Sequence, residues 1–199
     1  ATHSPHHPKK EWIDKYNGKF DLGWDKTREQ TIARQKQLGI VPPDTQLTKR
    51  HPEIPAWESL NAEQQGLYAY MMQVYAGFLS QTDYNVGRVL DAVAQLGQLD
   101  NTLVIYIVGD NGASQEGSMQ GSLNEIAGIN GIEESYQQVL AHKDEIGTWK
   151  THTHYPVGWA HATNAPFQWT KQVASHFGGT RNGMVLHWPK GITAKGEIR

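Results

Sequence analysis

The chain has 199 residues, a formal net charge of −2 at pH 7 and no cysteine. This composition excludes a basic nucleic-acid-binding surface, disulfides and thiolate metal sites, and no apolar stretch is long enough for a transmembrane helix. The length indicates one domain or one large piece of a bigger one. Both ends of the sequence look internal, so we expect a fragment of a longer protein.

The first third of the chain is predicted to be helical, with a proline-rich connection. Two prolines keep 3–8 (His-Ser-Pro-His-His-Pro) in a loop. Short helices are expected over 9–17 and 24–38, the second ended by Gly39. Four prolines make 41–57 an extended connection.

The longest predicted helix begins after Asn61. Asn61 is a suitable N-cap, and Gln64 stands three residues later in capping-box register. Apolar residues then recur at helical spacing, which predicts one buried face along the whole helix. They are Leu67, Met71, Val74, Phe78, Val86, Val89, Leu90, Val93 and Leu96.

A strand is predicted over 102–108, directly after this helix. Its apolar residues do not alternate with polar ones, which is typical of a strand covered on both faces in a parallel sheet. It ends in Gly109-Asp110-Asn111-Gly112, and ligands of open α/β sheets gather at such carboxyl ends. Asp110 and Asn111 offer the oxygen ligands that hard divalent cations prefer. Taken alone, however, the same residues favour a simple turn.

The segment 113–168 is a long polar excursion rich in histidine and aromatic residues. Excursions of this length are more often functional than idle. We expect a helix within 132–146. For the rest, a solvated loop is the default, an aromatic wall for the organic part of a substrate is one alternative, and a metal pair at His152 and His154 is another. A second buried strand is predicted over 183–188.

Two further side chains are candidates for chemistry. His3 suits a general acid or base, because an unperturbed imidazole titrates near neutrality, although a solvated loop histidine is the simpler interpretation. Lys171 suits an ammonium that holds an anionic group, although most lysines lie on the surface. The glycine turn 178–181 follows, and we expect Arg181 to stabilise that turn.

In this order the motifs resemble those of the type I sulfatases, in their bacterial arylsulfatase branch. The resemblance covers nearly the whole chain and rests on four pieces: His3-Ser4-Pro5 for the family's His-x-Pro loop; the helix with Tyr84-Asn-Val-Gly-Arg-Val-Leu90; the strand that leads into Asp110-Asn111-Gly112; and Trp169-Thr-Lys171 before Gly178-Gly179-Thr180-Arg181. Phe177 stands where many members have glutamate, and His6 and His7 compete with His3 for its role. We prefer His3 because it alone precedes x-Pro.

The resemblance implies a fold and a domain organisation. The fold would be α/β and alkaline-phosphatase-like, with a mixed or parallel sheet flanked by helices, incomplete in this chain. Residues 1–199 would be part of a single catalytic domain, with 113–168 as an active-site excursion. An N-terminal part and a C-terminal subdomain would lie outside the chain.

It also implies an activity, the hydrolysis of a small-molecule sulfate ester. The nucleophile would be a formylglycine made from a Cys/Ser-x-Pro-x-Arg motif, which is absent from these residues. Asp110 and Asn111 would bind Ca²⁺, with Mg²⁺ as the alternative. His3 would protonate the leaving-group oxygen, and Lys171 would bind the sulfate. We expect no nucleic-acid or membrane partner, and the oligomeric state and the compartment, bacterial cytoplasm or periplasm, stay open.

Two other functions remain as alternatives. One is a phosphomonoester or phosphodiester hydrolase of the alkaline phosphatase superfamily, which shares a metal at a strand end. The other is a noncatalytic calcium-binding or interaction module. The 199 residues alone are expected to be inactive, because the nucleophile is missing.

Overall fold

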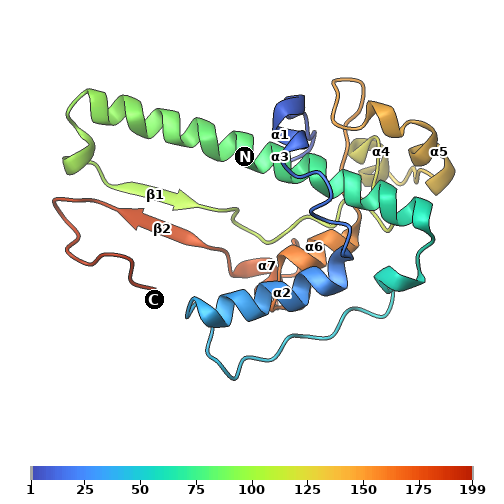
Figure 1. Cartoon of the computed structure of the whole chain (residues 1–199), viewed down its shortest axis with the longest axis horizontal. Coiled ribbons are helices and arrows are strands. Elements are labelled where there is room, and N and C mark those ends of the chain that lie inside the picture. Colours follow the sequence, from blue (N-terminus) through green and yellow to red (C-terminus); the bar gives the residue numbers. More distant parts are fainter. Residues whose placement is uncertain (1, 199) are drawn as a thin grey trace.

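The computed structural model describes residues 2–198 and shows a helical body with a two-stranded arm (Figure 1). The α-helices are α1 Lys10–Asp14, α2 Gly23–Gln37, α3 Ala62–Gln95, α4 Glu125–Ile129, α5 Tyr136–Ala141, α6 Val157–Thr163 and α7 Phe177–Thr180. Short 3₁₀ helices are η1 Trp57–Ser59, η2 Leu99–Asn101 and η3 Lys143–Glu145, and the strands are β1 Val104–Ile107 and β2 Met184–His187. No described helix is long and apolar enough to cross a membrane.

Helix α3 begins with the predicted capping box. The Asn61 side chain accepts from Gln64 N at 2.9 Å, and Asn61 N donates to Gln64 Oε1 at 3.1 Å. Only the first half of α3 is buried, up to Gly77. In its second half Val89 is 64% exposed, and Leu96 at its C-cap is 75% exposed, so the prediction of one buried face along the whole helix is wrong beyond that glycine.

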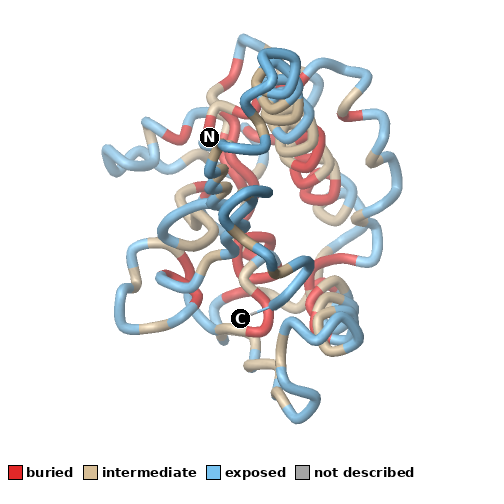
Figure 2. The backbone as a smooth tube through the Cα atoms, turned by 90° about the vertical axis from the view of Figure 1, so that its left-hand side faces the viewer, coloured by how far each residue is buried: buried red, intermediate tan, exposed pale blue. Residues whose placement is uncertain are grey.

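The core is built from aromatic residues of several elements. Trp24, Trp57 and Trp159 are buried with ring centroids 4.8 to 5.8 Å apart, and the Trp159 indole donates to Tyr68 O at 2.9 Å. The edge-to-face contacts join α2, η1 and α6, and the indole hydrogen bond adds α3. Figure 2 shows buried residues concentrated in the interior of the body.

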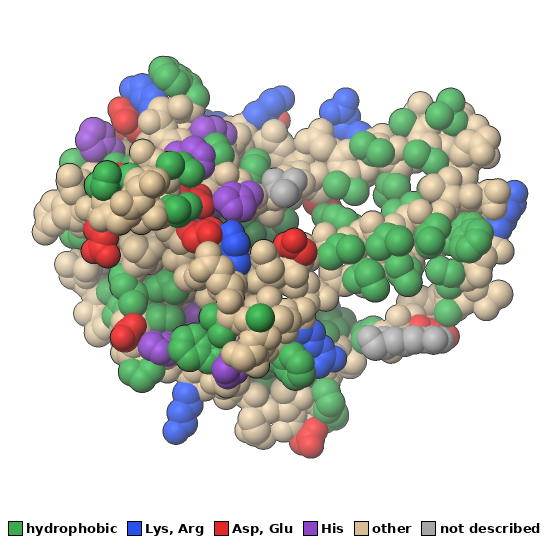
Figure 3. All heavy atoms as spheres, turned by 180° about the vertical axis from the view of Figure 1, so that it is seen from behind, with side chains coloured by type: hydrophobic (Ala, Val, Ile, Leu, Met, Phe, Trp, Pro, Cys, Tyr) green, Lys and Arg blue, Asp and Glu red, His purple; other side chains and the backbone are tan. Residues whose placement is uncertain are grey.

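The sheet differs from the prediction. β1 pairs with β2 in an antiparallel register, Val104 opposite His187 and Ile107 opposite Met184. Every residue of β2 is exposed, and Ile105 and Ile107 of β1 are 54% and 53% exposed. Apolar side chains accordingly cover the surface of this arm (Figure 3). The described residues therefore contain no parallel sheet, and neither strand is covered on both faces, because α3 is the helix that runs beside β1 and nothing described covers the other side.

The excursion 113–168 is folded into the body, so the default expectation of a solvated loop is wrong. Val139, Tyr155 and Trp159 are at most 2% exposed, and the predicted helix within it is α5. Most of its buried aromatic residues therefore serve the core, whereas Trp149 is 84% exposed. The predicted glycine turn after His176 is instead the short helix α7.

Candidate active site

His3 and Lys171 meet at a carboxylate, Glu116. Lys171 Nζ lies 2.8 and 3.0 Å from the two Glu116 oxygens and 3.5 Å from His3 Nε2. His3 Nε2 is 3.9 Å from Glu116 Oε2. Two residues 168 positions apart in the sequence are thus held at one point.

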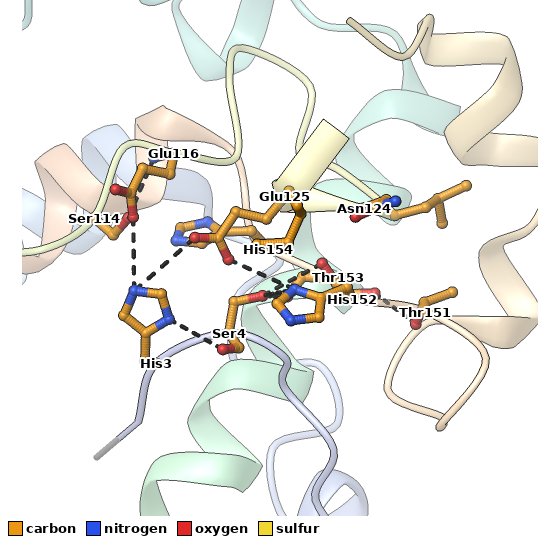
Figure 4. A network of polar contacts seen from close by, with 12 residues as sticks. His3, Ser4, Ser114, Glu116, Asn124, Glu125, Thr151, His152, Thr153 and His154 are labelled. Atoms are coloured by element: carbon orange, nitrogen blue, oxygen red, sulfur yellow. Dashed lines mark hydrogen bonds and ion pairs between the residues drawn. The ribbon is translucent and has the colours of Figure 1, made fainter. Parts of the chain in front are cut away.

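The His3 ring is oriented by its own loop. His3 Nδ1 lies 3.0 Å from Ser4 O, and because a carbonyl can only accept, this nitrogen carries the hydrogen. Ser4 Oγ donates to Thr153 O at 2.9 Å and therefore accepts from His152 Nδ1 at 3.1 Å. These contacts fasten the N-terminal loop to the segment around His152, and they leave His3 Nε2 facing the carboxylate (Figure 4).

Lys171 is held by a tightly folded loop. Its backbone N donates to Ala113 O at 2.9 Å, which joins the loop to the chain just after the Asp-Asn turn. The Asn164 side chain donates to Trp169 O and Gly178 O on either side of the lysine. Trp169 and Gln172 have φ of 67° and 75°, a conformation that non-glycine residues rarely adopt and that concentrates at functional sites.

Asp110 and Asn111 follow β1 and line the same cavity as His3 and Lys171. This cavity has a volume of about 1050 Å³, and both residues are exposed to it. The turn is held by Gly112, whose N–H donates to Asn182 Oδ1 at 3.1 Å. A carboxylate and an amide oxygen are suitable ligands for Ca²⁺, which takes six to eight oxygens, so these two residues would supply part of its shell.

The ion pair with Lys171 changes the protonation of Glu116. Burial raises the pKa of this carboxyl, but hydrogen bonds from Lys171 and from Ser114 Oγ at 2.7 Å outweigh it and lower the pKa to about 2. Glu116 is therefore a carboxylate throughout the ordinary pH range, and its charge fixes the Lys171 ammonium at the cavity.

Glu125 and His154 lie beside this group; His154 was expected only as half of a possible metal pair, and no motif marked Glu125. Glu125, the first residue of α4, is fully buried, with Oε1 4.0 Å from His3 Nε2 and Oε2 3.9 Å from His152 Nδ1. His154 is 2% exposed, its Nδ1 lies 2.9 Å from Tyr155 O, and burial lowers its pKa. The His152-x-His154 spacing gave a faint signal, but acidic residues in a polar stretch gave none.

The two competing histidines make other contacts. His6 is 1% exposed, and its ring stacks near those of Tyr75 and Tyr155, so burial lowers its pKa well below the usual value. His7 Nε2 donates to Thr151 O at 2.6 Å. His3 is therefore the histidine of this loop that meets Lys171.

Comparison with known proteins identifies the family. The sulfatase family model matches residues 1–198. The chain belongs to the sulfatase family. It is 33% identical to an arylsulfatase of Klebsiella aerogenes over 199 residues, and 30% identical to an uncharacterized sulfatase of Schizosaccharomyces pombe over 198 residues.

The sulfatase chain spans less than half the length of these relatives. All of it aligns with 40% of the Klebsiella protein, and 95% of it aligns with 33% of the yeast protein.

Proposed function

We propose that the protein hydrolyses aryl sulfate esters and that this chain supplies the leaving-group side of the active site together with part of its metal site. One observation carries the proposal. Lys171 Nζ and His3 Nε2 lie 3.5 Å apart on a cavity that Asp110 and Asn111 also line. A cation, an imidazole and oxygen ligands for a metal are the groups that sulfuryl transfer needs around one sulfate.

The ester oxygen gains negative charge as its S–O bond breaks. His3, in its imidazolium form with hydrogens on both ring nitrogens, donates the Nε2 proton to that oxygen, and Lys171 stabilises the remaining negative charge. Glu116 keeps the Lys171 ammonium in place, since both carboxylate oxygens bond to it. Asp110 and Asn111 would hold Ca²⁺, which when bound polarises the nonbridging sulfate oxygens.

The cavity wall favours an aromatic leaving group. Tyr16, Phe20, Tyr75 and Phe167 line the same cavity, and Met72 and Leu79 add apolar surface. Such walls exclude water and contact a flat ring, while the few polar groups orient the ester. The nucleophile of the proposal is the formylglycine that the family resemblance implies, and it is not encoded in these residues.

The experiment compares leaving groups in the full-length protein. Wild type and His3→Ala are assayed on 4-nitrophenyl sulfate and on unsubstituted phenyl sulfate, with 4-nitrophenyl phosphate as the competing substrate. Because a poor leaving group needs the proton more, we expect His3→Ala to lower kcat/KM far more on phenyl sulfate, by about 100-fold or more. An equal loss on both sulfates would reject His3 as the acid. A preference for the phosphate would reject sulfatase activity and favour the phosphatase alternative.

A further inference from the structure

We propose a second divalent-cation site, of the zinc type, formed by His3 Nε2, Glu116 and Glu125. Its three ligands do not include Asp110 or Asn111. The three ligand atoms all lie within 4.8 Å of one another, and they come from three segments of the chain that meet at this point (Figure 4).

The geometry suits a cation. His3 Nε2 is 3.9 Å from Glu116 Oε2 and 4.0 Å from Glu125 Oε1. A cation at the centre of such a triangle lies about 2.3 to 2.8 Å from each corner, so contraction by a few tenths of an ångström reaches the roughly 2.0 to 2.2 Å of Zn–N and Zn–O bonds.

The buried carboxylate of Glu125 is the feature that indicates a ligand. Its side chain is 0% exposed, and neither carboxylate oxygen has a hydrogen-bond partner among residues 2–198. Its neighbours His3 and His152 stay 3.9 to 4.0 Å away, and the His152 Nδ1 hydrogen already goes to Ser4 Oγ. A buried carboxylate without a donor is costly, and it is normally compensated by a charge partner or a metal.

The negative charges around the three ligand atoms exceed the positive charge of Lys171, which favours binding of a dication. Glu116 and Glu125 bring two carboxylates, whereas Lys171 brings one ammonium and bonds to Glu116 alone of the two. Lys171 also reaches Glu116 Oε1 at 3.0 Å, so the ion pair persists when Oε2 exchanges its bonds from Lys171 and Ser114 for a metal.

The donor set selects the metal. The Nδ1 hydrogen of His3 is directed at Ser4 O, so Nε2 presents the lone pair that a metal needs. One imidazole and two carboxylates, with a carbonyl orienting the ring, are typical of Zn²⁺ and less suited to Ca²⁺, which prefers oxygen alone. Bound zinc would occupy the nitrogen that the proposed function uses for proton transfer, and it would therefore inhibit hydrolysis.

The experiment measures zinc binding directly and does not depend on the proposed function. The full-length protein is stripped with a chelator, saturated with Ca²⁺ to fill the Asp110–Asn111 site, and titrated with ZnCl₂ by calorimetry. Co²⁺ substitution gives a visible spectrum that reports nitrogen and oxygen ligands. We expect one zinc per chain, and we expect Glu125→Gln to lower the zinc affinity more than about 100-fold. Even residues that only hydrogen-bond to metal ligands change metal affinity by about 10- to 100-fold when they are mutated, and Glu125 would bind the metal directly.

The controls separate this site from general histidine or carboxylate binding. Glu133→Gln removes an exposed glutamate of the same excursion and should bind zinc like wild type. Asp110→Asn should keep the zinc site and lose Ca²⁺ affinity. If circular dichroism shows that Glu125→Gln does not fold, Glu116→Gln is used instead. Absence of zinc binding in wild type, or unchanged affinity in the folded glutamate variant, overturns the proposal.

Discussion

Gly112→Ala should destabilise the protein by opening the contact between the Asp-Asn turn and α7. Gly112 has φ of 83°, and an added Cβ would lie 2.0 Å from Gly178 O and 3.1 Å from Gly179 Cα. Both obstacles belong to backbone, so no flexible side chain can move aside. The turn that carries Asp110 and Asn111 must then shift away from α7.

The magnitude follows from two costs. The left-handed conformation of a residue with a Cβ costs about 1 to 2 kcal/mol. Relieving the overlap with a packed backbone costs about 1 to 3 kcal/mol more. We therefore expect a loss of about 2 to 5 kcal/mol in the free energy of unfolding, together with weaker Ca²⁺ binding, because Asp110 and Asn111 move with the turn.

Two other glycines provide matched controls for the same chemical change. Gly97 has φ of 68° and no heavy atom within 4 Å of an added Cβ, so Gly97→Ala should cost only about 1 to 2 kcal/mol. Gly66 lies inside α3 with equally open space, so Gly66→Ala should gain about 0.5 to 1 kcal/mol. Urea unfolding followed by circular dichroism ranks the three variants. Equal losses at Gly112 and Gly97 would refute the close contact with α7.

Three further predictions concern charge, core and metal. Because the folded-state pKa of Glu116, about 2, lies below the usual 4.5, its pairing with Lys171 stabilises the fold above about pH 4.5, and this is lost as the pH falls toward 2. Glu116→Gln should remove about 1 to 2 kcal/mol at pH 7 and nothing near pH 2, after allowance for solvent screening; a pH-independent difference in urea unfolding would contradict this. Trp159→Ala should cost about 3 to 5 kcal/mol in thermal or urea unfolding, because the ring is fully buried and its indole bonds to Tyr68 O; a loss below 1 kcal/mol would contradict the packing. Asp110→Ala should lower Ca²⁺ affinity in calorimetry, and unchanged affinity would reject Asp110 as a ligand.

Local features of the fold were predictable from the sequence, whereas the surroundings of the strands were not. The capping box at Asn61 depends on residues three positions apart and is present as expected. The environment of β1 depends on what covers it. Tyr106 faces α3, where its hydroxyl donates to Asp83 Oδ1 at 3.3 Å, and Ile105 and Ile107 point to the open side. An apolar pattern predicts which strand residues could be buried, but it does not show whether another element packs on them.

The same distinction applies to the site. Ordered motifs make His3 and Lys171 candidates, and the structure brings their side chains together at Glu116. Glu116 and Glu125 have no motif of their own, since a glutamate in a polar stretch is ordinarily solvated. Only the fold of the excursion, which pairs Ser122 with His154 and places Glu125 N against His152 O, shows that these carboxylates are enclosed.

The most direct test of the central claim is kcat/KM for 4-nitrophenyl sulfate in Lys171→Met of the full-length protein. Lys150→Met is its control, since Lys150 pairs with Glu145 at 3.1 Å on the surface and its side chain is 52% exposed. Loss of a cation that stabilises the developing charge should lower kcat/KM by about 100- to 1,000-fold, and the control should match wild type. Wild-type turnover by folded Lys171→Met would contradict the proposal, because the sulfate ester would then react without the Lys171 ammonium and away from the point where His3 and Lys171 meet.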